Sequence, residues 1–265
     1  MHHIMTRMAN ICGILALATA AATTMPIAQA AGDGKWSLTT GFDYSTGSYG
    51  ESQDTTITYI PFTGKYATGP WTFGLTIPWI EVEGPGNVVR DLGRLRGTTT
   101  SSGTRTESGL GDIIAAATYN LLTTVDGRAL DVTGKFKAGT ADRNTGLGTG
   151  EDDLYVQLDG YRTIDRFTPF ATMGYKFLGS PPGVSLNNVF FAVVGSSYKL
   201  DDIRSMGLMW FVQQKASDNG SPSSEVTAFY TQKLAPQWKG QLYGVIGFAD
   251  GSPDLGIGAM VTRSF

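Results

Sequence analysis

The sequence predicts an all-β protein: a closed antiparallel transmembrane β-barrel of about twelve strands (residues 31–265) that follows an N-terminal signal peptide (residues 1–30). Three observations carry this prediction. The N-terminus has the pattern of a secretory signal, apolar and polar residues alternate along most of the remaining chain, and short links alternate with long ones. The composition agrees, because 35 glycines and 11% aromatic residues with only 16% charged residues favour strands and turns over amphipathic helices.

The N-terminal segment has the three parts of a secretory signal. Arg7 supplies the positive charge, residues 11–22 form the apolar stretch, and Ala28-Gln29-Ala30 is a small-x-small cleavage site. The apolar stretch is too short to span a membrane as a helix. We therefore expect cleavage after Ala30.

Alternation of apolar and polar residues predicts the strands. It is clearest at residues 130–139, where Val132 and Phe136 fall on one face while Lys135 and Lys137 fall on the other. The second expected strand has the weakest pattern, because a proline interrupts it. The expected strands lie near residues 36–48, 55–66, 71–82, 109–121, 129–139, 152–163, 167–178, 188–199, 204–216, 224–234, 238–248 and 256–265.

The links between the expected strands differ in length in a regular order. Short links, such as residues 164–166 and 235–237, alternate with longer links rich in glycine, serine and proline, of which residues 83–108 form the longest. A membrane barrel with both termini in the periplasm has this order, with short turns inside and long loops outside. A soluble barrel has no reason to keep it.

The apolar faces carry aromatic residues near the strand ends, as in the aromatic girdles of membrane barrels. We therefore expect these faces to meet the lipid and lipopolysaccharide of the outer membrane of a Gram-negative bacterium, and the polar faces to line a lumen. A soluble core with packed aromatics is the alternative. The expected girdle residues are Trp36, Trp71, Trp79, Tyr119, Phe177, Tyr198, Trp238 and Phe248.

The C-terminus ends on Phe265 after an alternating apolar stretch. This ending resembles the signal that the outer-membrane assembly machinery reads, so we expect that machinery as a partner. Arg263 stands on the apolar face of the stretch and departs from the pattern. Its long side chain can still reach the periplasmic head groups.

The expected mature chain lacks the residues on which most barrel enzymes depend. The only histidines of the full sequence, His2 and His3, and its only cysteine, Cys12, precede the cleavage site and are removed with the signal peptide. Hydrolases of this class use a histidine base, so we predict that the protein is not an enzyme. We expect no metal site, because zinc would have only carboxylates to bind it, and no cofactor. With Arg7 removed, 19 basic residues against 23 acidic ones give the mature chain a net charge of −4, which, without a basic run, argues against nucleic acid as a partner.

The polar faces and the longest link hold the candidate functional residues. Mixed charge inside a barrel fits either a constricted pore or a lumen closed by ion pairs, and we favour a narrow or partly plugged pore. The link 83–108, with Arg90, Arg94, Arg96 and Arg105, is a candidate loop that covers or enters the mouth, or else an external loop without function. The candidate lumen residues are Asp112, Asp131, Lys135, Lys137, Tyr155, Gln157, Asp159, Lys176, Lys233, Lys239, Gln241 and Tyr243.

Four motifs together resemble those of one family, and the last of them in the chain is Met173-Gly174-Tyr175-Lys176. Ser108-Gly109-Leu110-Gly111-Asp112 leads into an expected strand, Leu75-Thr76-Ile77-Pro78-Trp79 ends another, and residues 146–153 form a glycine-rich loop. In this order, over roughly residues 55–180, they are similar to outer-membrane proteins of the MetA-pathway of phenol degradation family. The resemblance implies an outer-membrane channel or transporter, linked in part of the family to small hydrophobic or aromatic compounds. It implies no particular binding residues.

The sequence thus predicts an outer-membrane channel or transporter that passes small solutes, including small hydrophobic or aromatic compounds, through a narrow polar lumen. The alternative is a non-transporting structural or adhesive barrel that acts through its external loops. Single-channel conductance distinguishes the two.

Overall fold

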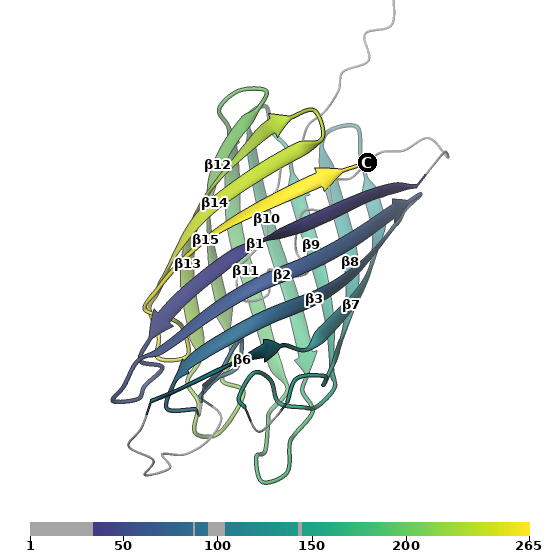
Figure 1. The fold of residues 1–265 in the computed structure, drawn as a ribbon. Coiled ribbons are helices and arrows are strands. Elements are labelled where there is room, and N and C mark those ends of the chain that lie inside the picture. Colours follow the sequence, from purple (N-terminus) through teal and green to yellow (C-terminus); the bar gives the residue numbers. More distant parts are fainter. Residues whose placement is uncertain (1–33, 87, 95–103, 143–144) are drawn as a thin grey trace, which may run out of the picture.

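The computed structural model describes residues 34–86, 88–94, 104–142 and 145–265, and it forms a closed antiparallel barrel (Figure 1). The strands of the barrel are β1 (Lys35–Gly47), β2 (Thr55–Thr68), β3 (Trp71–Gly84), β6 (Arg105–Leu110), β7 (Ile113–Thr123), β8 (Arg128–Ala138), β9 (Asp153–Arg162), β10 (Phe167–Phe177), β11 (Val189–Lys199), β12 (Arg204–Gln213), β13 (Ser223–Ala235), β14 (Trp238–Gly247) and β15 (Leu255–Ser264). Two short strands, β4 (Val88–Val89) and β5 (Gly93–Arg94), form a separate hairpin. The predicted signal peptide lies outside the described residues.

Strands β6 and β7 act as one strand of the barrel. Both pair with β3, β6 along residues 79–84 and β7 along residues 71–76. With the two taken together, the described barrel has the twelve strands that the sequence predicts. β1 pairs with both β2 and β15, and the Phe265 amide donates a hydrogen bond to the Trp36 carbonyl (2.9 Å), so the sheet closes on itself.

The predicted strand boundaries agree with the structure to within two residues at most ends. The fourth strand was expected to begin at residue 109, but β6 begins at Arg105. The ninth was expected to end at residue 216, but β12 ends at Gln213. β2 is continuous although Pro61 weakens its pattern, because Pro61 lies opposite Pro78 and the two missing amide donors coincide at one place in the ladder.

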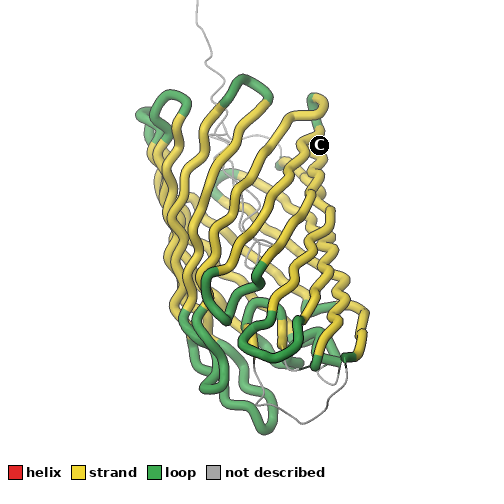
Figure 2. The backbone as a smooth tube through the Cα atoms, turned by 90° about the vertical axis from the view of Figure 1, so that its left-hand side faces the viewer, coloured by secondary structure: helices red, strands yellow, loops and turns green. Residues whose placement is uncertain are grey.

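The two ends of the barrel differ, as the alternating link lengths predict. Tight turns and the C-terminus lie at one end, which we call the short-turn end, and the longer loops lie at the other, the long-loop end (Figure 2). In membrane barrels, short turns face the periplasm and long loops face outside. No helix among the described residues is long and apolar enough to cross a membrane.

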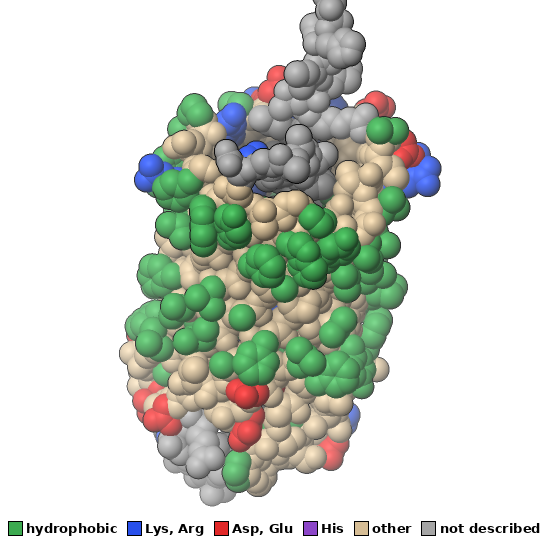
Figure 3. Space-filling view, turned by 90° about the vertical axis from the view of Figure 1, so that its right-hand side faces the viewer, with side chains coloured by type: hydrophobic (Ala, Val, Ile, Leu, Met, Phe, Trp, Pro, Cys, Tyr) green, Lys and Arg blue, Asp and Glu red, His purple; other side chains and the backbone are tan. Residues whose placement is uncertain are grey.

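The outer face of the barrel is apolar. All eight predicted girdle residues are exposed or half-buried on it, and Figure 3 shows on one face that hydrophobic side chains cover the middle while charged side chains lie towards the ends. Arg263 lies at the short-turn end, where its guanidinium stands 5.5 Å from the Trp238 ring and 4.6 Å from the Phe265 ring. Large apolar side chains exposed on every strand suit lipid and are the opposite of a soluble core.

The inside of the barrel has two kinds of wall. One consists of charged and polar side chains, and the other, which we call the apolar wall, lies mainly on β10–β14. The expectation of a polar interior therefore holds for only part of the lumen. β11 reads Phe190-Phe191-Ala192-Val193-Val194, so both of its faces are apolar and alternation gives no sign of an apolar inner face. The apolar wall comprises Phe170, Phe191, Val193, Met209, Phe211, Phe229, Tyr243 and Val245.

Candidate functional site

Strand geometry places the candidate lumen residues on the inner face. Successive side chains of a strand point to opposite faces, and on β8 Lys135 and Lys137 are buried while Phe136 between them is exposed. Four of the twelve candidates are half-buried: Asp159, Lys233, Lys239 and Gln241. The other eight are buried: Asp112, Asp131, Lys135, Lys137, Tyr155, Gln157, Lys176 and Tyr243.

Asp112 points into the barrel at a β-bulge between β6 and β7. Residues 111–113 oppose only residues 77–78 of β3, which leaves one residue more on one side of the ladder. Such a bulge re-aims a side chain. A Cβ atom on Gly111 would lie 2.5 Å from the side chain of Ile80, so glycine permits the close approach. The Gly-Leu-Gly-Asp motif of the sequence thus places a carboxylate inside the long-loop end.

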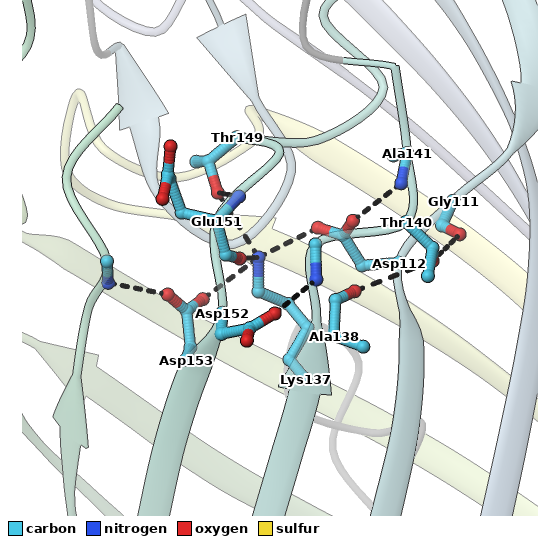
Figure 4. A network of polar contacts seen from close by, with 12 residues as sticks. Gly111, Asp112, Lys137, Ala138, Thr140, Ala141, Thr149, Glu151, Asp152 and Asp153 are labelled. Atoms are coloured by element: carbon cyan, nitrogen blue, oxygen red, sulfur yellow. Dashed lines mark hydrogen bonds and ion pairs between the residues drawn. The ribbon is translucent and has the colours of Figure 1, made fainter. Parts of the chain in front are cut away.

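Lys137 is the centre of a buried polar network (Figure 4). Its Nζ atom lies 2.7 Å from a carboxylate oxygen of Asp112 and 3.0 Å from one of Asp153. It also donates hydrogen bonds to the Glu151 carbonyl (3.2 Å) and the Thr149 hydroxyl (3.3 Å). Two carboxylates therefore pair with the one ammonium of Lys137, and the three groups together carry no excess positive charge.

The same two carboxylates fix the rim of the barrel. The second oxygen of Asp112 accepts a hydrogen bond from the Ala141 amide (2.9 Å), and the second oxygen of Asp153 accepts one from the Gly179 amide (2.9 Å). These amides belong to the loops that follow β8 and β10. The network therefore ties two long loops to the barrel wall.

The described start of the link 83–108 lies inside the barrel. We call residues 88–92 the inward segment. Its end residues, Val88 and Leu92, are buried, and Leu92 packs in a cluster with Leu178, Leu186 and Val189. Polar contacts with side chains on the inner faces of β1, β2 and β12 show that the segment occupies the lumen near the long-loop end.

Arg90 joins the inward segment to one side of the wall, and Asp91 joins it to the other. The Arg90 Nη1 atom lies 3.2 Å from Asp43 on β1, and its guanidinium carbon lies 3.6 Å from the centre of the Tyr59 ring on β2. On β12, the Gln213 side-chain amide donates a hydrogen bond to the Asp91 carbonyl (3.0 Å). The segment therefore bridges the lumen.

Burial shifts the pKa values of the two charged side chains of the inward segment in opposite directions. For Arg90, burial lowers the pKa, but Asp43 and Asp91 outweigh it, so the pKa of the guanidinium lies above its usual value and the group stays charged. For Asp91, burial raises the pKa of the carboxyl above its usual value, although Arg90 and Lys176 act against the rise. The environment inside the barrel therefore favours the charged form of Arg90 and disfavours the charged form of Asp91.

Of the four arginines predicted for the mouth, the structure describes the side chains of two, Arg90 and Arg105. Arg90 is inside the lumen, while Arg105 is exposed at the start of β6. The backbone of Arg94 belongs to β5, and its side chain and the whole of Arg96 lie outside the described residues. Of the four, the structure thus assigns a buried ion pair to Arg90.

Two residues of this site were not among the candidates. Tyr59 belongs to the strand in which Pro61 blurs the alternation, and Asp91 belongs to a link without any period. One signal was present: an Arg-Asp pair stands inside the apolar stretch Val88-Val89-Arg90-Asp91-Leu92. Charges enclosed by apolar residues in a long link indicate a buried pair.

Comparison with known proteins identifies the fold. No protein-family model matches the chain, and no curated protein is similar to it in sequence. The COG4313 outer membrane channel from Pseudomonas putida F1 superposes with a TM-score of 0.68 at 12% identity, over 91% of this chain and 98% of that chain. The KdgM porin in complex with disordered oligogalacturonate gives 0.50 at 11% identity, over 86% and 99%. The beta domain of the Bordetella autotransporter BrkA gives 0.53 at 14% identity, over 88% and 99%. At these identities the likeness concerns the fold.

Proposed function

We propose that the protein is a channel of the Gram-negative outer membrane that passes small solutes through a narrow lumen. One observation carries the proposal: a barrel with an apolar outer face encloses buried charged side chains, and the inward segment narrows the space between them without filling it. Charged and polar side chains on the inner wall are typical of barrels that conduct water-borne solutes across lipid. A cavity beside Arg90 remains between the segment and the wall, bordered by Asp43, Glu225 and Phe211.

We infer further that the solutes include small hydrophobic or aromatic compounds. The apolar wall supports this, because an aqueous pore for ions alone has no need of a cluster of aliphatic and aromatic side chains inside. The motifs at residues 75–79, 108–112 and 146–153 support a relation to the phenol degradation family. In the fold, the second of these motifs forms the bulge that positions Asp112.

The membrane partners follow from the same reading. Lipid would cover the apolar outer face, lipopolysaccharide would surround the long-loop end, and the assembly machinery would read the strand that ends at Phe265. Cleavage after Ala30 would precede insertion. Catalysis has no place in this proposal, because the expected mature chain offers no histidine base.

Planar-bilayer recording tests the proposal. We expect the purified protein to give a small single-channel conductance, and a variant with residues 85–104 replaced by a short glycine-serine link to give a larger one. If neither protein conducts although both are correctly folded and inserted, the channel proposal is wrong. A non-transporting barrel that acts through its external loops would then be the better reading.

A further inference from the structure

Three lysines lie along one line on the inner wall, and we call them the lysine row: Lys65, Lys135 and Lys176. Directly paired positions connect them from strand to strand. The order of paired residues is Lys65, Gly74, Ala116, Lys135, Tyr155 and Lys176, on β2, β3, β7, β8, β9 and β10. Directly paired residues point to the same face of a sheet, so all three ammonium groups enter the lumen.

The row also climbs through the lumen. Strands in a barrel are tilted by roughly 35–45° to its axis, so a line perpendicular to them rises along the axis as it passes around the wall. Between Lys65 and Lys135 the row holds only Gly74 and Ala116, and a Cβ atom on Gly74 would lie 3.8 Å from the side chain of Lys65. The row therefore makes a rising cationic track and not a flat ring.

Lys135 is the central member, and its environment differs from that of its neighbour Lys137. The side chain of Lys135 is 2% exposed, and its Nζ atom has no hydrogen-bond partner among the described residues. Lys137, two residues away, has two carboxylates against its ammonium. A buried ammonium with unused donors is costly unless something accepts its hydrogen bonds. Lys135 is thus poised for an acceptor that comes from outside the protein.

The apolar wall faces the lysine row. In the cyclic order of twelve strands, β8 and β14 are six positions apart, so Lys135 and the apolar wall residues Tyr243 and Val245 stand on opposite sides of the lumen. At the other end of the row the two surfaces meet, because the Lys176 Nζ atom lies 5.7 Å from the centre of the Phe191 ring. The lumen is therefore amphipathic across its width.

We propose that the lumen binds organic anions with an apolar body, the carboxylate on the lysine row and the body against the apolar wall. The proposal rests on the proposed channel function and names its solute class. A lysine row alone would take inorganic anions, and an apolar wall alone would take neutral molecules. A carboxylate joined to a ring or alkyl chain satisfies both surfaces at once, with charge-assisted hydrogen bonds at Lys135 and apolar contact opposite.

Equilibrium dialysis of the detergent-solubilised full chain tests the proposal with three probes. Benzoate carries both features, benzamide keeps the ring without the charge, and inorganic phosphate keeps charge without the ring. We expect benzoate to bind at least about tenfold more tightly than benzamide or phosphate. One charge-assisted hydrogen bond, or the burial of one ring, accounts for a difference in affinity of this size.

Two lumen variants and one control separate the two surfaces. Lys135→Gln should weaken benzoate binding about tenfold or more and leave benzamide unchanged. Phe229→Ala should weaken benzoate and benzamide and leave phosphate unchanged. Lys199→Gln, at an exposed turn where Lys199 pairs with Asp202, should change none of the three.

Each other outcome overturns the proposal. Equal binding of phosphate and benzoate, unaffected by Phe229→Ala, would mean a plain anion site. Equal binding of benzamide and benzoate would mean a site for neutral molecules, and no binding of any probe would mean that the two surfaces form no site. Because dialysis needs no ion current, a protein that fails to conduct can still bind benzoate, so the two proposals fail separately.

Discussion

The guanidinium of Arg90 lies 3.2 Å from the carboxylate of Asp43, and this ion pair joins the inward segment to strand β1. Its side chains are 13% and 4% exposed, so the pair is screened little by water. A residue of a long link is thus tied to the first strand inside the lumen.

Arg90→Ala is expected to raise the single-channel conductance. The substitution leaves Asp43 buried without its partner, which costs the inward arrangement about 3–5 kcal/mol and favours release of the segment. Arg105→Ala, at an exposed position of the same link, is the matched control and should leave the conductance unchanged. Equal conductance of wild type and Arg90→Ala in planar bilayers would show that the ion pair does not hold the constriction.

Acidification is expected to lower the conductance through Asp91. Burial raises the pKa of this carboxyl above its usual value of 3.8 when the segment lies inside the barrel. The inward arrangement therefore binds a proton more tightly than a segment released to water, and it gains stability as the pH falls through the raised pKa. Asp91→Asn, which is neutral at every pH, should conduct less than wild type near neutral pH.

The pH response of the variant supplies the control. Asp43 and Glu225 border the same cavity and remain in Asp91→Asn, so its response should be weaker than that of wild type but not absent. Conductance recorded from about pH 7 to about pH 4 spans the range in which a raised carboxyl titrates. A conductance that rises on acidification, equally in both proteins, would contradict the role of Asp91.

Lys137→Met is expected to lower the free energy of unfolding by about 3–5 kcal/mol, because Asp112 and Asp153 would face each other without their shared cation. Adding Asp112→Asn to this variant should recover part of the loss. Lys199→Met removes a lysine whose partner Asp202 is 94% exposed, so it should cost no more than about 1 kcal/mol. Folding and unfolding in lipid vesicles as a function of urea concentration gives these free energies. Equal losses of stability for the two lysine variants would mean that the network adds no stability.

The strands were predictable where their two faces differ. On β8 the alternation of lysines with Val132 and Phe136 fixes both the face and the boundaries, because lipid and lumen demand opposite residue types. On β11 consecutive residues are apolar, so both faces of the strand look suited to lipid. The sequence therefore contains no sign that one of these faces forms part of the apolar wall inside the barrel. The alternating lengths of the links predicted the two unlike ends, because successive links of an antiparallel barrel lie at opposite ends.

The contacts of the candidate site could not be read from the sequence. Lys137 meets Asp112 and Asp153 only because the register of β7, β8 and β9 and the bulge at Gly111 bring them together. A shift of one residue in any of these pairings would turn the side chains to the outer face. The residue types were therefore predictable as lumen candidates, but the register determines which of the two lysines of β8 forms ion pairs.

The two faces of β9 are expected to respond differently to the same substitution. Val156 is 43% exposed on the outer face, where an arginine in lipid costs roughly 2–4 kcal/mol near the middle of the bilayer. Gln157 points inward and donates hydrogen bonds to Asp159 (2.9 and 2.8 Å), so an arginine there gains a carboxylate partner. Val156→Arg should therefore impair folding into vesicles, measured by the heat-dependent shift in gel mobility, and Gln157→Arg should not. Equal impairment would argue that the outer face does not meet lipid.

Lys135 is expected to set the ion preference of the lumen, and Lys137 is not. Both lie on the inner face of β8, two residues apart, so a reading of the strand alone gives them equal weight. The structure separates them, since two carboxylates neutralise Lys137 while the Lys135 ammonium has no hydrogen-bond partner among the described residues. In a narrow pore with walls of low dielectric constant, a fixed charge that is not in direct contact with an opposite charge acts on a passing ion with little screening. Lys135→Glu should therefore move the reversal potential in a salt gradient towards cation preference. The double variant Lys137→Gln/Asp112→Asn, which removes one charge of each sign, should move it much less. The comparison is made in variants whose gel mobility shows a folded barrel, because loss of the Lys137 network also costs stability. If the double variant moves the reversal potential as far as Lys135→Glu does, Lys137 and Asp112 do not balance each other. If neither variant moves it, ions do not pass along this side of the lumen.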